Sequence, residues 1–461
     1  MTATVREVPA ARRRAAAWLD RAARLAFATL IVAMPWRLRI DPFPHPTSLA
    51  APLSDVILYL VDGLVLATLG LWLLARLADR RPIRTGPRSI QVPVVVLVAL
   101  GWLTLPFGVA PALSVFGAVR LTALVLLALY VINEVGGLAG LAVPLGLMIA
   151  IQGAVAIGQF VTQGSLGLER LGEVELDPAV RWSSIVLRED GVRILRAYGL
   201  ALHPNVLGGF FAAAIPLLLA RRPTGLAARI LQVALVGLAV GGLLVTFSRG
   251  AWLGLAAGTV AAILVGARRV AGSDRRQWLA TGGLALLVLV AGGWQLRGEL
   301  AVRTGLAPVQ TAAERRSVDE RVAQIQLGWR VVQERPLLGV GMSAVPVEME
   351  RLDPAFGFDY YPPHLVLLVV AGELGVAGGL ALLALLIAPW VLLLRDRGRW
   401  NRELAAASGA LAVVTVVGMF DDYPWVGGPG RTLFWVVLAL WVMAWGRAAP
   451  RTAPRTAADA S

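Results

Sequence analysis

The sequence predicts an all-α polytopic membrane protein with about twelve transmembrane helices. Of its 461 residues, 57% are apolar and 16% are charged, whereas about one-quarter of the residues of a soluble domain are charged. The mean hydropathy is +0.70. Apolar runs of about 20 residues recur along the whole chain, and each is long enough to cross roughly 30 Å of hydrocarbon. This composition excludes a water-soluble enzyme of the same size.

The apolar runs give the expected membrane spans in chain order. We expect spans at 21–38, 55–76, 92–107, 113–133, 138–162, 204–221, 227–246, 250–267, 277–296, 364–395, 402–420 and 430–446. The tenth run is too long for one simple crossing. Its glycines predict a short interfacial helix that bends before it spans; they are Gly372, Gly375, Gly378 and Gly379.

Spans and loops together predict how the chain is organised. We expect a first bundle of about five spans (1–162), an outer loop (163–203), a core of about four spans (204–296), a large outer loop (297–363), the last spans (364–446) and a disordered cytoplasmic tail (447–461). Arginines gather on alternate loops, so the positive-inside rule places both termini in the cytoplasm. The two long loops then face outward.

Short amphipathic helices are expected in both long outer loops. In the second loop, apolar residues recur at alternating steps of four and three, which predicts a helix over 314–334. The recurring residues are Val318, Val322, Ile325, Trp329 and Val332. This helix either lies on the membrane surface or caps the bundle.

Polar groups within or beside the spans identify where chemistry is expected. The chain has no cysteine, which excludes disulfides and thiolate chemistry. Asp62 and Arg120 lie at similar depth in their spans, so we expect a structural ion pair; a place in the lining of a substrate cavity is the alternative. The chain's three histidines, His45, His203 and His364, all fall on the outer side in this topology, so the chemistry is expected to face outward.

Four stretches on the outer side carry the functional prediction. They are Arg196-Ala-Tyr-Gly-Leu200 followed by His203-Pro-Asn205, then Thr246-Phe-Ser-Arg-Gly-Ala-Trp252, then Trp329 followed by Arg335-Pro-Leu-Leu-Gly-Val-Gly341, and last His364 with Gly375 after ten intervening residues. Together they resemble the O-antigen ligase and polymerase superfamily of bacterial inner-membrane proteins. Arg196 and Leu200 match its R-x3-L element, His364 and Gly375 match H-x10-G, and Ser248-Arg249-Gly250 matches the SRG turn.

The resemblance implies an O-antigen ligase-like glycosyltransferase of lipopolysaccharide biosynthesis. Such enzymes move a glycan from undecaprenyl diphosphate to a hydroxyl of a glycan or glycolipid acceptor, on the outer side of the inner membrane and without a metal or other cofactor. The partners are then the lipid-linked donor, the acceptor and membrane lipids, and no nucleic acid. A polysaccharide polymerase of the same superfamily is the alternative. A polysaccharide or lipid transporter is the alternative from another class, but the chain shows no halved repeat.

The residue types suit this reaction. A lipid diphosphate leaving group needs charge neutralisation, and arginine binds phosphate oxygens bidentately, so Arg196 and Arg249 are predicted diphosphate clamps. A neutral histidine can take the proton of an acceptor hydroxyl, which is the role predicted for His364. The remaining candidates for substrate binding are Arg193, Tyr198, His203, Asn205, Trp329 and Glu373.

For several of these residues a purely structural role is the alternative. Arg249 could be an ordinary interfacial arginine, and His203 with Pro204 could simply begin a helix. Glu373 lies nine residues after His364, so it faces elsewhere unless the helix bends. The pair Asp421-Asp422 is expected to form a solvated turn that caps the eleventh span, and no metal is expected there.

Overall fold

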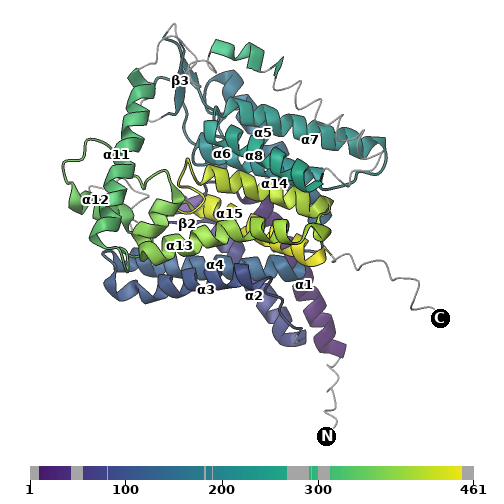
Figure 1. Cartoon of the computed structure of the whole chain (residues 1–461). Helices are drawn as coiled ribbons and strands as arrows, with labels where there is room; N and C mark the ends of the chain where they lie inside the picture. The colour runs from purple at the N-terminus through teal and green to yellow at the C-terminus, as the bar shows by residue number, and fades with distance from the viewer. Residues whose placement is uncertain are drawn as a thin grey trace.

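The computed structural model describes residues 10–42, 56–79, 81–180, 183–188, 191–266, 290–291, 293–298 and 312–448. Nearly all secondary structure in this part of the chain is helical (Figure 1). The helices are α1 (Ala10–Ala33), α2 (Leu60–Asp79), α3 (Arg88–Leu103), α4 (Pro111–Glu134), α5 (Ala142–Thr162), α6 (Pro204–Leu219), α7 (Leu226–Val245), α8 (Arg249–Gly266), α11 (Ala312–Glu334), α12 (Val345–Leu352), α13 (Val366–Arg395), α14 (Arg402–Val417) and α15 (Gly428–Arg447).

The helices confirm the predicted class of an all-α polytopic membrane protein. Among the described residues, seven helices are long and apolar enough to cross a membrane: α2, α4, α5 with its preceding turn, α7, α8, α13 and α15. Helices α3 and α6 are apolar but shorter. Most of the expected ninth span, 277–296, and of the tail, 447–461, lies outside the described residues. The count of twelve spans therefore stays a prediction.

Helix α15 forms the centre of the bundle. It is buried from Gly428 to Trp445, because its apolar residues face neighbouring helices on all sides, among them α4 and α14. Helix α14 in turn packs tightly on α8. A Cβ added to Gly258 of α8 would lie 2.6 Å from the carbonyl oxygen of Gly409, so these small residues allow the two backbones to approach closely.

The first long loop contains a hairpin where an amphipathic helix was expected, and that expectation is wrong. Strands β3 (Ile185–Leu187) and β4 (Arg193–Leu195) pair antiparallel, with Val186 opposite Ile194. Both strands contain β-branched residues, which favour extended backbone, and Gly191 adopts a positive φ in the connection. A second short pair, β1 (Arg39–Ile40) with β2 (Leu58–Tyr59), joins the first two helices.

The second long loop contains the predicted helix. Helix α11 begins at Ala312 and ends at Glu334, which confirms the prediction for 314–334, and α12 follows it. Figure 1 shows α11 lying across one end of the bundle, roughly perpendicular to the long membrane helices. We refer to this as the α11 end of the bundle.

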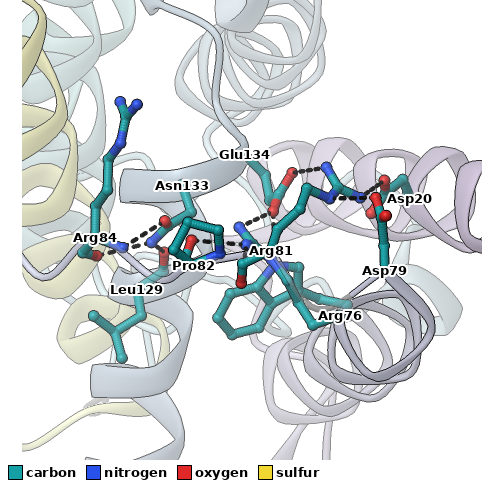
Figure 2. Close-up of polar contacts among 10 residues, drawn as sticks. Asp20, Arg76, Asp79, Arg81, Pro82, Arg84, Leu129, Asn133 and Glu134 are labelled. Carbon is teal, nitrogen blue, oxygen red and sulfur yellow. Dashed lines mark hydrogen bonds and ion pairs between the residues drawn. The ribbon is translucent and has the colours of Figure 1, made fainter. Parts of the chain in front are cut away.

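An ion-pair cluster ties α1, α2 and α4 together at the other end of the bundle (Figure 2). Arg76 pairs with Glu134 at 2.5 Å, and Arg81 reaches Asp20 of α1 and Asp79 of α2. The indole of Trp72 also donates to Glu134, at 2.9 Å. These contacts hold the arginine-rich segment that precedes α3 against the helix ends.

The predicted ion pair between Asp62 and Arg120 is present. Arg120 donates to both carboxylate oxygens of Asp62, at 3.0 Å and 2.5 Å, and to the carbonyl oxygen of Ile57 at 2.8 Å. Its guanidinium also lies over the ring of Phe116, 4.3 Å from the ring centroid. The charge and the hydrogen-bonding groups of Arg120 are thereby satisfied between α2 and α4. An ionised side chain within a membrane span requires such partners.

Candidate functional site

Arg196 is buried directly after strand β4 and is fully engaged by the protein. Its side chain is 3% exposed. It donates to the carbonyl oxygen of Thr246 at 2.8 Å, to Ser184 Oγ at 2.8 Å and to Asn205 Oδ1 at 2.5 Å. The guanidinium therefore joins β3, the start of α6 and the turn before α8.

Two glutamines of α5 position the loop that carries Arg196. The amide oxygen of Gln159 accepts from the backbone N–H groups of Tyr198 and Gly199, and that of Gln152 accepts from Leu200. Gly199 has a φ of +58°, and a Cβ there would lie 2.5 Å from the Gln152 oxygen, so the loop requires glycine at this position. The R-x3-L element thus folds as a tight, buried turn.

His203 and Asn205 form the entry to α6. His203 is the N-cap, and its Nδ1 accepts from the backbone N–H of Asn205 at 3.1 Å, with Pro204 at the first helical position. This confirms the helix-entry reading of His203-Pro204. The Asn205 amide nitrogen donates onward to Asp421 Oδ2 at 2.7 Å.

Asp421 lies at the turn between α14 and α15 and faces His364. Its side chain comes within 3.4 Å of His364, measured from Oδ1 to Nδ1, and Asp422 Oδ1 lies 3.6 Å from the same nitrogen. Asp421 is 8% exposed, so the expected solvated turn is wrong. The turn is buried because α6 covers it. Gly209 of α6 lies so close to Tyr423, the residue after Asp422, that a Cβ added to the glycine would collide with the tyrosine hydroxyl.

A continuous chain of polar contacts therefore connects three distant stretches of sequence. It runs from Arg196 through Asn205 to Asp421, and from Asp421 to His364. Sequence reasoning named Arg196, Asn205 and His364 as site residues but placed Asp421 in a solvated turn. The available signal was an acidic pair between two apolar spans on the same side of the membrane as His364.

The charges of this group shift its pKa values. Burial raises the pKa of Asp422 to about 7; the charge of Asp421 adds to the rise and His364 opposes it. Burial alone would lower the pKa of His364, but the two carboxylates outweigh it and raise that pKa above its usual value. His364 outweighs burial at Asp421 and lowers the pKa of that carboxyl. The buried negative charge is therefore held mainly by Asp421.

The residues that follow His364 are shaped by a bend in α13. Gly375 has a φ of +73° and interrupts the helix, which confirms the predicted bend. The segment 335–341 fits onto this bend: the backbone N–H of Val340 donates to Gly372 at 2.9 Å, and that of Val376 donates to Pro336 at 2.8 Å. The last residue of the H-x10-G element is therefore where two of the four predicted stretches meet.

Glu373 is committed to this same bend and lies away from His364. One carboxylate oxygen accepts from the backbone N–H of Ser343 at 2.8 Å, and the other accepts from the indole of Trp425 at 2.8 Å. Glu373 and Trp425 are both buried. The described contacts of Glu373 thus join the loop before α12 to the segment before α15.

Helix α11 packs against the segment that leads to His364. A Cβ added to Gly328 would collide with Pro363, and Gln324 donates to the carbonyl oxygen of Asp359 at 3.2 Å, so α11 packs directly on the segment before His364. Arg321, on the same part of α11, lies close enough to oppose the protonation of His364. Arg321 is a second residue that sequence reasoning missed.

Arg249 begins α8 beside the same turn. A Cβ on its neighbour Gly250 would lie 3.7 Å from the Cβ of Phe420, the residue before Asp421. Arg249 is partly exposed, and the preceding turn is tight, with Phe247 at a φ of +48°. The structure therefore brings the SRG turn next to the aspartates.

The other predicted residues are either exposed or enclosed by the protein. Arg193 is exposed on the hairpin and donates to the carbonyl oxygens of Pro178 and Val180. Tyr198 is buried, and its oxygen accepts from the backbone N–H of Ser184 at 2.9 Å. Trp329 is 54% exposed on α11.

Two further features bear on ligands. An apolar crevice between α13, α14 and α15 opens directly beneath the aspartate turn; it is lined by Val366, Leu382, Leu386, Val414, Thr415, Gly418, Met419, Pro424, Trp425 and Phe434. Among the described residues, His364, Asp421 and Asp422 are also the group whose ligand atoms lie within 4.8 Å of one another, as a divalent metal would require. Both oxygens of Asp421 already accept hydrogen bonds, from Asn205 and from the Asp422 backbone N–H.

Comparison with known proteins identifies one stretch of the chain that is similar to a known family. Residues 233–383 match the family model described as O-antigen ligase. The comparison with curated proteins found no match. The matched stretch contains Arg249, Arg321 and His364, while Arg196 and Asp421 come from outside it and pack against it. The chain is therefore a helical membrane protein with a stretch similar to the O-antigen ligase family, and the histidine of that stretch lies at one end of the membrane helices.

Proposed function

We propose that the protein is a ligase-type glycosyltransferase. It moves a glycan from undecaprenyl diphosphate to an acceptor hydroxyl, and its site faces the outer side of the bacterial inner membrane. The observation that carries the proposal is the placement of His364 against Asp421, which Asn205 and Arg196 hold in position. This is the arrangement of a general base whose partner orients it.

The proposed reaction needs one proton acceptor and one leaving group. The acceptor oxygen attacks the anomeric carbon of the donor glycan. The bond from that carbon to the diphosphate oxygen breaks, and its electron pair leaves with the lipid diphosphate. The hydroxyl proton passes to His364 Nε2, because Nδ1 faces the aspartates. Asp421 then stabilises the imidazolium that forms.

We assign the neutralisation of the negative charge on the leaving diphosphate to Arg249 and Arg321. Arg249 stands at the first residue of α8, where the helix dipole also favours an anion. Arg321 of α11 acts electrostatically on both His364 and Asp421. Arg196, whose guanidinium is buried and holds three acceptors, acts through Asn205 as a positioning residue.

The lipid part of the donor is assigned to the apolar crevice beneath the site, which must widen to admit it because only about 10 Å³ of it is open space. Its lining is almost entirely aliphatic and aromatic, and it lies between membrane helices directly below Asp421. A polyisoprenoid chain is chemically matched to such a surface. The diphosphate of a lipid held there would meet the aspartate turn and Arg249.

Several predicted roles stay predictions. Five residues were expected to bind substrate: Arg193, Tyr198, His203, Trp329 and Glu373. The described contacts of four of them are to the protein itself, and Trp329 is exposed. A polymerase of the same superfamily would use the same donor chemistry, with a lipid-linked repeat unit as the acceptor.

Complementation of a deletion strain tests the proposal. We expect His364→Ala, Asp421→Ala and Arg249→Ala to abolish glycan attachment at wild-type protein levels, while Arg315→Ala, on the exposed face of α11, attaches glycan normally. Long lipid-linked chains should accumulate in the inactive strains. Accumulation of single lipid-linked repeat units would instead show that the protein is a polymerase. A wild-type glycan profile with His364→Ala would refute the proposed site.

A further inference from the structure

Helix α11 presents a narrow apolar stripe that the rest of the described chain leaves uncovered. The stripe consists of Val318, Val322, Ile325 and Trp329, whose exposed fractions lie between 38% and 54%. At 100° per residue these four side chains fall within a narrow sector of the helix. They are therefore one continuous surface and not scattered apolar residues.

The stripe lies on a different side of α11 from the face that holds the helix in place. Leu327 and Val331 are buried and pack with Val340, Val345 and Met349. Gln324, one turn before Gly328, is also buried. The packing requirement of α11 is thus met without the stripe, so the stripe is available to a partner.

The stripe continues into apolar surface at the end of the membrane helices. Arg335, directly after α11, donates to the carbonyl oxygen of Phe107 at 3.3 Å, just beyond the end of α3. Phe107 and Leu103 are exposed there, and Leu337 beside Arg335 is 80% exposed. Exposed apolar side chains at the end of a membrane helix face lipid. The C-terminal end of α11 therefore joins the lipid-facing surface of the bundle.

We propose that the apolar stripe of α11 rests in the interfacial region of the bilayer leaflet at this end of the bundle. An exposed stripe of aliphatic side chains with a tryptophan, on a helix lying across the ends of membrane helices, is what an interfacial helix presents to lipid. Exposed charges elsewhere on the helix are of both signs: Arg315, Arg316, Asp319, Arg330 and Glu334. Binding then depends on apolar burial, and zwitterionic lipid is sufficient.

Because the chain has no cysteine, single cysteines can report this contact directly. Val322→Cys and Ile325→Cys place a nitroxide on the stripe. Asp319→Cys and Glu334→Cys, exposed positions on the charged side of the same helix, are the matched controls. Each full-length labelled chain is placed singly in a phosphatidylcholine nanodisc. Collision of the nitroxide is then measured with oxygen, which partitions into hydrocarbon, and with a water-soluble nickel chelate.

The proposal predicts a ratio of oxygen to nickel accessibility that is severalfold higher at the two stripe positions than at the two controls. A melting temperature equal to that of the unlabelled chain shows that each label is tolerated. High nickel accessibility at the stripe would mean that it faces water, and would overturn the proposal. Low accessibility to both reagents would mean that protein covers the stripe, and would overturn it equally.

Discussion

Replacing Asp421 by asparagine tests whether the His364–Asp421 contact sets the proton affinity of the base. Asparagine has nearly the same shape, and its one side-chain oxygen can still accept the hydrogen bond from Asn205, although its amide nitrogen replaces the oxygen that accepts from the Asp422 backbone N–H. The substitution therefore removes a negative charge 3.4 Å from His364 Nδ1 while leaving the local packing in place. The quantity to follow is the pH dependence of kcat/KM.

The direction of the shift follows from the protonation state of His364 that the Asp421 charge favours. The carboxylates raise the pKa of His364, so the neutral imidazole that can accept a proton exists only above this raised value. Without the Asp421 charge the imidazolium loses a partner and the pKa of His364 falls. The acidic limb of the profile should therefore move to lower pH.

The geometry also indicates the size of the effect. Two unit charges 3.4 Å apart attract by roughly 5 kcal/mol at an effective dielectric constant of about 20. This is a ceiling, because burial of His364 opposes the charged form and Asp422 remains 3.6 Å away. We expect the midpoint of the acidic limb to fall by about 1 to 3 pH units.

The assay is transfer of a labelled glycan from a lipid diphosphate donor in proteoliposomes. It is measured from about pH 5 to about pH 9, a range that brackets the usual histidine pKa. Asp422→Asn should move the midpoint in the same direction but by less, because this carboxyl also raises the pKa of His364 and is itself partly protonated, with a pKa raised to about 7. Asp319→Asn, which removes an exposed carboxyl of α11, is the control that should leave the midpoint unchanged. An unchanged midpoint in Asp421→Asn, with only a lower rate, would refute the proposed role of the contact.

Four further predictions concern stability, metal and topology. Gly375→Ala should lower the melting temperature and the activity together, because φ is +73° and the new Cβ would collide with the carbonyl of Leu337, whereas Gly63→Ala, with nothing within 4 Å, should be tolerated. Arg196→Ala should lower the free energy of unfolding by about 3 kcal/mol, measured by thermal unfolding in detergent, since it leaves three buried acceptors without a charged donor. Chelator should leave transfer unchanged; restoration of a chelator-inhibited rate by one divalent ion would assign the His364 group to a metal. A reporter fused after Ser461 should report the cytoplasm, and a periplasmic signal would reverse the orientation.

The membrane helices could be predicted closely because lipid imposes one simple requirement on them. A segment that crosses hydrocarbon must be apolar and must satisfy its own backbone, so hydropathy locates it directly. The expected spans 113–133, 227–246 and 430–446 correspond to α4, α7 and α15 within a few residues. The β3–β4 hairpin was missed because its strands are three residues long and lie in a mixed-charge loop, where no periodic pattern can develop.

The site could be predicted only in part, because its partners come together through tertiary packing. His364 was identified from its motif, but nothing local to Asp421 says that the turn between α14 and α15 folds under α6 and against the start of α13. Read alone, two adjacent aspartates between apolar spans look solvated. The close approach of Tyr423 to Gly209, which buries this turn, depends on residues far apart in the sequence.

The motif residues divide into those that hold the site and those placed to act in it. Arg196 was predicted as a diphosphate clamp on the strength of its charge, yet its three donated hydrogen bonds go to Thr246, Ser184 and Asn205. A guanidinium in this position fixes the oxygen of Asn205, and the amide nitrogen of Asn205 is thereby turned toward Asp421. The same logic applies to Gly375, whose positive φ lets the 335–341 segment dock beside it. Both motif residues can therefore be indispensable without touching substrate, and Arg196→Lys, which keeps the charge but loses the planar fork, separates the two roles. If positioning is its role, Arg196→Lys should lower activity and shift the pH profile as Asp421→Asn does, while leaving the KM for the lipid donor unchanged.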